Sequence, residues 1–530
     1  MNSAYGRSSL WQLVVLWALL MAVSLLTRTF VPIDETRYVT VAWEMWLRGD
    51  FLVPHLNGAT YAHKPPLLFW LYDLGWWLFG VNDWWPRLVA PLFGLGSLAL
   101  TFLLARRLWP ERPRVAMLAS WLLFGSVFWT GYTTAAMFDM LVTFFTLLGL
   151  YGVWQAGKGQ RIGWLWLGIA IGLGILAKGP VILLHTLPAA LLAPWWSSEA
   201  SNQKARWYLH LLGAFVLGAV IALAWAIPAA LRGGEAYANA IFWGQTANRV
   251  VDSFAHKRAF WWYLPLLPLI FYPWAWWPPV WRGLASLTGE KGVAALRFCL
   301  AWLIPGFLFL MLISGKQVHY LLPLFPAVAL LGARGIEHIS RREFTFRLPG
   351  TVLVLLSLGV LSLIWWQDRP DWAEGIEPAW GALPLLAGMA LLVIRTERLF
   401  HAVRILTLVS VLVVIALHLV LKGPLNHSYD LTPVAEALKE LQTQGAPIVH
   451  ESKYAGEYHF LARLKQPLKV LRRKNLETWA RQHPDGYILY YFSSRQKERI
   501  PAASLLVHRY RGDYVAIIPS EVYLQNLDRL

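Results

Sequence analysis

Charged residues and cysteines are scarce in this sequence, and each scarcity excludes a class of protein. Only 15% of the 530 residues are charged, whereas 57% are hydrophobic. Most of the surface must therefore face something other than water, which excludes a soluble globular enzyme and indicates an integral membrane protein in contact with lipid. The one cysteine, Cys299, lies within an apolar run, so a disulfide within the chain is excluded.

Acidic residues are also few, and the basic excess has a topological explanation. The chain has 47 Lys and Arg against 30 Asp and Glu, a net charge of +17. Such a surplus could serve nucleic-acid binding. Much of it, however, lies in one alternating set of short loops between apolar runs. The positive-inside rule assigns that set to the cytoplasm, so we expect no nucleic-acid partner.

Long apolar runs dominate the first four fifths of the sequence. A helix of about 20 residues crosses a hydrocarbon core of about 30 Å, and thirteen runs approach that length: 9–27, 87–107, 115–132, 138–155, 161–177, 179–196, 208–229, 261–281, 296–313, 319–335, 349–366, 379–395 and 404–421. The first lacks a small-residue cleavage site, so we interpret it as an anchor rather than a signal peptide. The expected fold is an all-α polytopic domain over 1–421, with a cytoplasmic N-terminus and an external C-terminus.

Three stretches on the external side are too long to be simple connections: 28–86, 230–260 and the residues after 421. The first is rich in Trp and Tyr, and its apolar spacing predicts two short interfacial helices, over 37–47 and 65–79. After 421 charged residues become frequent, which predicts a small external α/β domain over 422–530. Its expected elements are helices over 432–441 and 475–482 and strands over 447–450, 487–492 and 514–518.

Acidic residues at the external edge are the first candidates for chemistry. Asp34 and Glu35 follow the first run directly, with Arg37 close by, and Asp139 stands isolated between the third and fourth runs. Charges beside hydrocarbon are costly and are usually functional. Each Asp has an alternative interpretation as a helix cap. If Asp34 and Asp139 lie at the same depth, they form a two-carboxylate site that positions an acceptor or binds a divalent cation.

Basic residues gather on the same side of the membrane. They are Lys64, the neighbours Lys257 and Arg258, and Lys316, which precedes Tyr320. Any one of them could extend its charge to lipid headgroups, but several on one face suit a phosphate, because a phosphate beside hydrocarbon needs several charged donors. Together they predict a lipid-phosphate substrate. His63 and His256 could ligate zinc, although two histidines alone do not define a site.

The order of these motifs resembles a known family. The series runs from Asp-Glu-Thr-Arg-Tyr at 34–38 through Tyr-Ala-His-Lys-Pro-Pro at 61–66 to His256–Tyr263 and Ser314–Tyr320, over roughly the first 340 residues. It is similar to the bacterial aminoarabinose lipid A transferases and their relatives in the protein O-mannosyltransferase superfamily. These are polyprenyl-phosphate-dependent glycosyltransferases with the GT-C fold.

The resemblance implies an activity and roles for the residues. Such an enzyme takes a sugar, here 4-amino-4-deoxy-L-arabinose, from undecaprenyl phosphate and transfers it with inversion to lipid A or a related envelope glycolipid. The reaction takes place at the periplasmic face of the bacterial inner membrane. By this resemblance Asp34 and Asp139 flank the reaction centre, and Lys64, Lys257 or Arg258, and Tyr320 contact the carrier phosphate, with Arg37 close by. Where relatives have a glutamate that resembles a zinc ligand, this chain has His63, so a zinc site would pair His63 with His256.

Other functions fit parts of the pattern. The same fold could use another sugar, or a protein acceptor, because the acidic motif defines the chemistry more securely than the substrate. A transporter or flippase for a polyprenyl-linked lipid would use the same cations without breaking a bond. It would need polar residues deep within several spans, and the sequence has few there. A scaffold would give no reason for the acidic and basic residues to occur in family order.

Overall fold

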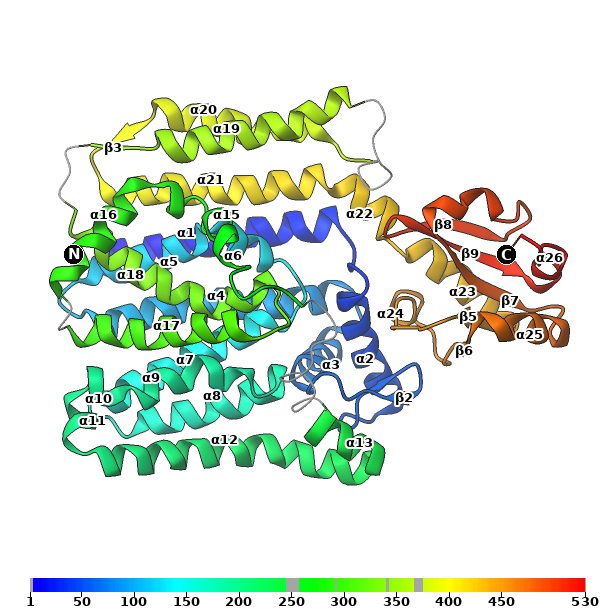
Figure 1. Ribbon diagram of the computed structural model, residues 1–530, viewed down its shortest axis with the longest axis horizontal. Helices are drawn as coiled ribbons and strands as arrows, with labels where there is room; N and C mark the ends of the chain where they lie inside the picture. Colours follow the sequence, from blue (N-terminus) through cyan, green and yellow to red (C-terminus); the bar gives the residue numbers. More distant parts are fainter. Residues whose placement is uncertain (1–2, 245–256, 291–292, 340–342, 367–374, 530) are drawn as a thin grey trace.

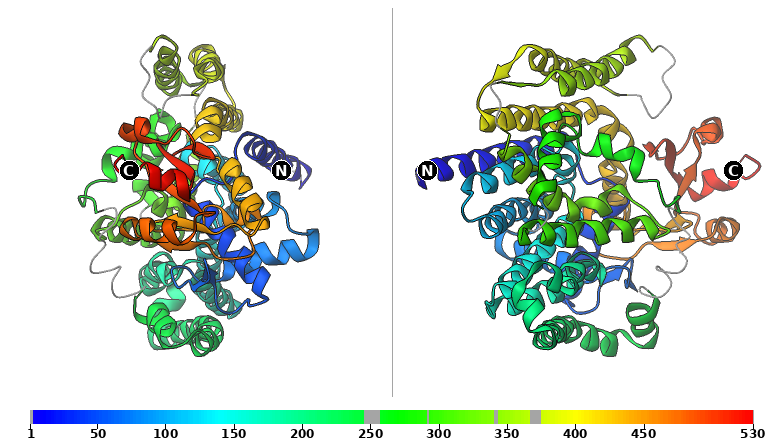
Figure 2. Two further views of the ribbon diagram at one scale, coloured as in Figure 1. Left: turned by 90° about the vertical axis from the view of Figure 1, so that its right-hand side faces the viewer. Right: turned by 60° about the vertical axis from the view of Figure 1, so that its left-hand side comes forward.

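The computed structural model describes residues 3–244, 257–290, 293–339, 343–366 and 375–529. Long helices run side by side along the longest axis, and a small sheet domain projects from one end (Figure 1). The N-terminus lies at the opposite end of the helices from the C-terminal domain, as the turned views also show (Figure 2). The chain is therefore a helical bundle with the sheet domain at one end and the N-terminus at the other.

Eight helices in the described ranges are long and apolar enough to cross a membrane. They are α1 (Ser3–Thr27), α4 (Trp84–Leu108), α7 (Asp139–Gly157), α12 (Lys204–Gly233), α17 (Ala294–Leu312), η5 with α18 (Val318–Leu324 and Phe325–Glu337), α19 with η6 (Arg347–Ser362 and Leu363–Trp365) and α21 (Leu399–Val420). Each coincides with one of the thirteen predicted runs. The chain is thus a multi-pass membrane protein.

The other five predicted runs form shorter elements. Four contain the apolar helices α5 (Pro113–Phe124), α8 (Ile162–Lys178), α9 (Val181–Leu191) and α20 (Ala382–Val393, preceded by η8, Pro378–Gly381). The prediction of one helix over 261–281 is wrong. That run divides into η2 (Leu264–Leu266), α15 (Leu267–Ile270), η3 (Trp274–Trp276) and the start of α16 (Pro278–Ser286). Its repeated prolines remove backbone donors and interrupt the helix.

Short helices connect the long ones. They are α6 (Val127–Tyr132), α10 (Ala193–Trp196), α11 (Ser198–Asn202), α13 (Glu235–Asn239), η1 (Ala240–Gly244) and η4 (Leu287–Glu290). The strands β3 (Phe344–Thr345) and β4 (Arg395–Thr396) pair antiparallel. In Figure 1 they lie at the end of the bundle away from the sheet domain.

The two short helices predicted within 28–86 are present, and their place at a membrane interface stays a prediction. They are α2 (Asp34–Arg48) and α3 (Leu67–Phe79), which lie across the ends of the long helices, with the hairpin β1 (His55–Leu56) and β2 (Ala59–Thr60) between them (Figure 1). Helix α2 stops at Gly49, whose φ of 62° lets its N–H reach the carbonyl of Trp46. A glycine adopts this left-handed conformation without a steric penalty.

The last hundred residues form a five-stranded sheet in the order β6-β5-β7-β9-β8. Its elements are α22 (Lys422–Ser428), α23 (Thr432–Thr443), β5 (Ile448–Glu451), α24 (His459–Ala462), β6 (Lys469–Leu471), η9 (Arg473–Asn475), α25 (Leu476–Gln482), β7 (Tyr487–Phe492), η10 (Ser494–Arg499), β8 (Leu506–Tyr510), β9 (Asp513–Pro519) and α26 (Ser520–Gln525). Strands β5, β6 and β7 are parallel, whereas β9 pairs antiparallel with β7 and β8. Helices α23 and α24 pack on one face and α25 and α26 on the other.

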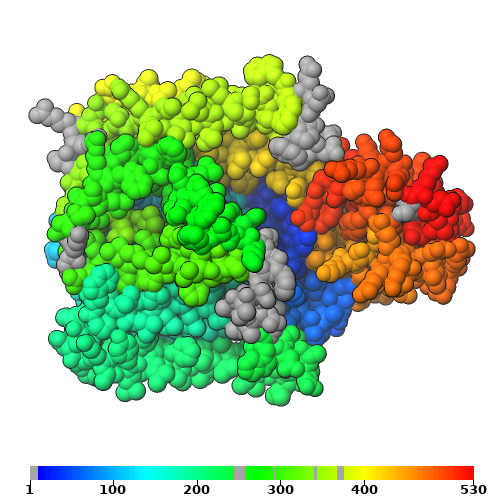
Figure 3. Space-filling model, in the orientation of Figure 1, coloured from blue at the N-terminus to red at the C-terminus, as the bar shows by residue number. Residues whose placement is uncertain are grey.

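The sheet domain docks on α2 and α3 through the loops around α24. Thr40 donates a hydrogen bond to the carbonyl of Gly456 at 2.7 Å, and the Trp43 indole donates to the carbonyl of Leu464 at 2.9 Å. Phe460 stacks on Trp76 with ring centroids 5.1 Å apart and joins the main hydrophobic core. Figure 3 shows this domain in contact with the bundle at one end. The α2 helix is therefore held between the bundle and the sheet domain.

Candidate active site

Asp34 is the first residue of α2 and keeps an accessible carboxylate. Its side chain is 53% exposed and pairs with the Arg37 guanidinium at 2.8 Å. The Tyr38 hydroxyl donates to the same oxygen at 3.3 Å. The cap residue of α2 is Ile33, so Asp34 does not act as the cap that the sequence allowed. An accessible carboxylate at the end of the bundle can receive a proton from a substrate or hold a substrate hydroxyl.

Asp139 begins α7 and is buried beside a lysine. Its side chain is 4% exposed, and one oxygen accepts from Lys178 at 2.6 Å. The Tyr132 hydroxyl donates to the other oxygen at 3.3 Å. The positive charge of Lys64 is also close enough to act on Asp139. Asp139 therefore lies in an ion-paired cluster and does not cap its helix, where the cap residue is Phe138.

Tyr38 joins the surroundings of the two carboxylates. Its ring packs edge-on against Phe138 with centroids 4.7 Å apart, and the Lys64 ammonium lies 5.6 Å from the centroid of the same Phe138 ring. Burial, and then the negative charge of Asp34, raise the pKa of Tyr38 well above its ordinary value, and Asp139 acts in the same direction. Both carboxylates are thus close enough to affect one hydroxyl. Asp34 and Lys64 thus lie on either side of the Tyr38–Phe138 ring pair, and Phe138 directly precedes Asp139.

The remaining predicted cations lie in the segment 314–320 or contact it. Lys178 lies 5.0 Å from the Tyr320 ring centroid, so Tyr320 borders the cluster of Asp139. Lys257 pairs with Gly315 across a β-bridge, and the Arg258 N–H donates to the carbonyl of Ser314 at 3.0 Å. The basic pair Lys257–Arg258 is therefore anchored to the chain that leads to Tyr320.

Lys316 has a different environment from the one predicted. It is buried, and its ammonium donates to the carbonyls of Ile313 and Arg258, the latter at 3.3 Å. These contacts fasten the two chain segments together. Lys257 is exposed, and the Arg258 guanidinium lies over the Trp262 ring at 5.7 Å. Of these three cations, Lys257 and Arg258 are the better placed to meet an anionic ligand.

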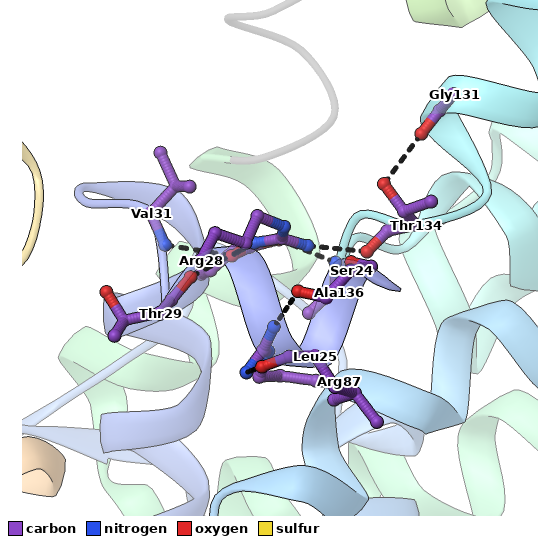
Figure 4. A network of polar contacts seen from close by, with 10 residues as sticks. Ser24, Leu25, Arg28, Thr29, Val31, Arg87, Gly131, Thr134 and Ala136 are labelled. Atoms are coloured by element: carbon purple, nitrogen blue, oxygen red, sulfur yellow. Dashed lines mark hydrogen bonds and ion pairs between the residues drawn. The ribbon is translucent and has the colours of Figure 1, made fainter. Parts of the chain in front are cut away.

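Glu35 differs from its neighbour Asp34 because protein groups surround it. Its carboxylate accepts from Arg28 at 2.6 Å, from the Val31 N–H at 2.8 Å and from the Ala136 N–H at 2.7 Å. Arg28 also donates to the carbonyl of Thr134 at 2.5 Å (Figure 4). The ion pair of Arg28 and Glu35 therefore joins the start of α2 to the loop before Asp139. Burial acts to raise the pKa of Glu35, but Arg28 and the two N–H groups outweigh it and lower the pKa.

The metal prediction has little support among the described residues. They contain no group of three or more His, Cys, Asp or Glu side chains that could hold a metal ion. His63 is exposed and stacks on Tyr61 at 5.3 Å, and His256 lies outside the described residues. A zinc site requires three or four ligands, so we derive no chemistry from a metal. The pairing of His63 with His256 stays a prediction.

Several residues of the site were not selected from the sequence. Lys178 neutralises Asp139, Tyr132 donates to it, and His319 stacks on Tyr132 at 5.2 Å. Lys178 ends an apolar helix directly before Gly179-Pro180, a position that also suits a lysine extending to lipid headgroups. Arg28, at the end of the first run, is subject to the same ambiguity. A long-range partner distinguishes the two roles, and only the structure shows it.

Comparison with known proteins gives both a family and a fold. The sequence profile "Dolichyl-phosphate-mannose-protein mannosyltransferase" matches residues 63–227. The chain is 31% identical over 385 residues to an "Undecaprenyl phosphate-alpha-4-amino-4-deoxy-L-arabinose arabinosyl transferase" of Edwardsiella ictaluri, covering 70% of this chain and 67% of that protein. It is 34% identical over 344 residues to a protein of that name from Pseudomonas fluorescens, covering 62% of this chain and 60% of the relative.

Two solved structures share the whole architecture. The crystal structure of ArnT from Cupriavidus metallidurans in the apo state superposes with a TM-score of 0.77 at 19% identity, over 98% of this chain and 99% of that one. The same protein bound to undecaprenyl phosphate gives a TM-score of 0.76 at 20% identity, with the same coverage. At this identity the similarity shows a common fold, from the first span to the C-terminal sheet domain.

Proposed function

Because the chain belongs to the family of undecaprenyl phosphate-aminoarabinose arabinosyl transferases, we propose that it is a membrane glycosyltransferase using an undecaprenyl phosphate-linked donor. The sugar is 4-amino-4-deoxy-L-arabinose, and the acceptor is lipid A or a related envelope glycolipid. We place the reaction at the periplasmic face of the bacterial inner membrane, because the loops at the other end of the bundle carry the basic residues typical of the cytoplasmic side. The C-terminal sheet domain is then periplasmic.

The observation that carries the proposal is that the two aspartates differ in solvent exposure. Asp139 is buried and held by Lys178, whereas Asp34 remains accessible beside Arg37. Lys64 lies near them. The exposed residues Lys257 and Arg258 are held by backbone contacts to Ser314 and Gly315, in the segment that ends at Tyr320. Fixed cations beside an accessible carboxylate suit a reaction in which a phosphate leaves and a hydroxyl attacks.

The transfer proceeds in one displacement. An acceptor oxygen attacks the anomeric carbon from the face opposite the carrier, and the bond from that carbon to the phosphate oxygen breaks with its electron pair moving to the phosphate. Configuration at the carbon is inverted. The basic residues stabilise the negative charge that develops on the leaving phosphate, and Lys64 and Arg258 are our candidates for that contact.

The role of Asp34 depends on the acceptor group. If a hydroxyl attacks, Asp34 takes its proton as general base. If a phosphate oxygen attacks, no proton has to be removed, and Asp34 orients the acceptor or the sugar. Asp139 with Lys178 forms a rigid wall of the site, because a buried ion pair with a 2.6 Å contact has little freedom to move. Glu35 is better described as a positioning residue, since protein donors surround its carboxylate.

The test compares envelope lipids by mass spectrometry in cells that carry the wild-type gene, Asp34→Asn, or no copy. Asp485→Asn is the matched control, because it removes an exposed carboxylate from the turn before β7. We expect the deletion and Asp34→Asn strains to lose an aminopentose-sized mass from lipid A, and Asp485→Asn to retain it, at equal protein abundance. A loss from other glycoconjugates instead would preserve the chemistry and refute the lipid A acceptor. Unaltered glycoconjugates in every strain would refute the transferase.

A further inference from the structure

Asp73 is a buried acid for which the proposed reaction has no use. It lies in the middle of α3 with 4% of its surface exposed. Neither carboxylate oxygen has a hydrogen-bond partner among the described residues. This differs from Glu35 and Asp139, which are equally buried but ion-paired. Burying a polar group without a partner is costly, so this position requires an explanation.

Asp73 lines a cavity of about 620 Å³ at the external end of the bundle. Its lining residues come from α2, the loop after α2, α3 and the last turn of α12, elements that Figure 1 shows at the same end of the bundle. Its walls are mainly aromatic and aliphatic, with Trp46, Trp70, Trp77 and Leu74 among the lining residues. The Trp70 indole is fixed by a hydrogen bond to the carbonyl of Phe51 at 2.6 Å. A volume of this size is typical of a site for a small organic group.

The other charged groups of the cavity are already paired. Asp50 accepts from the Arg232 guanidinium at 3.2 Å and from the Leu52 N–H at 3.0 Å. Arg232 is 62% exposed at the side chain, and it is its Nε that pairs with Asp50. The residues that line the cavity therefore include a buried carboxylate without a hydrogen-bond partner among the described residues, three tryptophans and one partly exposed cation.

We propose that this cavity binds the headgroup of a zwitterionic, ethanolamine-type phospholipid, with the ammonium at Asp73 and the phosphate at Arg232. A carboxylate combined with aromatic faces is the chemistry that recognises an ammonium group, and a partly exposed arginine suits a phosphate. The acyl chains would lie along α3, where Leu74, Trp77 and Leu78 are exposed. Trp side chains are typical of the level of the membrane at which headgroups lie.

The state of Asp73 agrees with a site for a cationic ligand. Burial raises the pKa of Asp73 to about 8, which favours the neutral form of the carboxyl group near pH 7. An incoming ammonium favours the ionised form, and the resulting pair satisfies the carboxylate. The inference is independent of the transferase assignment, because it uses neither Asp34 nor Asp139.

Lipid binding to the purified full-length chain in detergent tests the proposal. Native mass spectrometry would compare phosphatidylethanolamine with phosphatidylglycerol of identical acyl chains. We expect wild type to bind the ethanolamine lipid at least tenfold more tightly, and Asp73→Asn to bind the two lipids equally. The control is Asp83→Asn, which removes an acid in the loop after α3 that pairs with Arg463 outside the cavity; it should keep the preference. Equal binding by wild type, or a preference that survives in Asp73→Asn, would overturn the proposal.

A change in the lipid gives the same answer without a variant. N-acetyl phosphatidylethanolamine keeps the phosphate and the acyl chains but has no ammonium charge. We expect the wild-type chain to bind it at least tenfold more weakly than the parent lipid. Equal affinity for the two lipids would show that the ammonium is not recognised. Loss of activity in Asp34→Asn with lipid selectivity retained would separate this site from the reaction centre.

Discussion

Replacing Glu35 by glutamine should destabilise the protein far more than replacing its neighbour Asp34 by asparagine. Glu35 accepts three hydrogen bonds, one of them from its ion-pair partner Arg28, and both side chains are almost completely buried. Glutamine has nearly the same shape and keeps one acceptor oxygen. It leaves the Arg28 guanidinium buried without a counter-charge, and one acceptor of the carboxylate is lost. Asp34 is half exposed, so its substitution leaves no buried charge unpaired.

The expected magnitude follows from the cost of breaking a buried ion pair. Removing one partner of such a pair costs about 3–5 kcal/mol, which is a large part of a typical total stability of about 5–15 kcal/mol. Arg28→Met combined with Glu35→Gln should recover most of that loss, because no charge remains buried. Asp34→Asn should change stability by less than about 1 kcal/mol, as expected for an exposed pair.

Thermal unfolding in detergent, followed by the fluorescence of the many tryptophans, would measure these differences, together with transferase activity below the unfolding range. For Glu35→Gln we expect a lower melting temperature with part of the activity retained in the folded fraction. For Asp34→Asn we expect a wild-type melting temperature and a loss of activity of at least about a hundredfold, typical of removing a general base. If Glu35→Gln melts like wild type and is inactive, Glu35 takes part in the reaction and the positioning role is wrong.

Three further predictions concern other contacts. Lys178→Met leaves Asp139 buried without its cation, so it should lower the free energy of unfolding by about 3–5 kcal/mol and abolish turnover. Lys178→Arg should retain part of the stability and part of the activity. Thermal unfolding and product formation measure the two effects. Phe460→Ala removes a buried ring between the sheet domain and α3 and should lower the free energy of unfolding by about 3–5 kcal/mol. Limited proteolysis would detect earlier release of the C-terminal domain. Resistance equal to that of the wild type would contradict the docking. The pKa of Asp73, raised by burial to about 8, lies above its value in the unfolded chain, so the folded state holds a proton that the unfolded state releases. Wild-type stability should therefore fall relative to Asp73→Asn as pH rises from about 4 to 8, by at most about 6 kcal/mol; a pH-independent difference in melting temperature would refute this.

Apolar periodicity and helix-stop residues predicted those helices and strands that carry a clear local sequence pattern. Helix α2 has a regular apolar face and a glycine stop, and it lies where expected. Strands β5, β7 and β9 carry the apolar runs of the sheet domain and were also predicted. Strand β6 has three residues that are exposed or half-buried, and β8 is partly exposed throughout. Neither has the alternation that identifies a strand, so both were missed.

The site shows the same division between local and distant information. Asp34 and Glu35 are neighbours of the same charge, so the sequence could not separate their roles. About 100° of rotation between successive helical residues points one carboxylate toward solvent and the other toward Arg28. The partners of Arg28 and Asp139 come from distant parts of the chain: Thr134 is 106 residues from Arg28, and Lys178 is 39 residues from Asp139. No periodicity connects residues at such separations, and only the assembled bundle identifies the pairs.

The docking of the sheet domain on α2 has a consequence for how the protein is made. The hydrogen bond between Thr40 and Gly456 joins residues 416 positions apart. At about 5–20 residues per second, a ribosome needs roughly 20–80 seconds to extend the chain over that distance. During this time α2 has been synthesised and carries Asp34, but the surface that covers Trp43 and Trp76 does not yet exist. The reaction centre thus reaches its final packing only when the last domain has been translated, so a truncated chain should insert into the membrane and yet remain inactive.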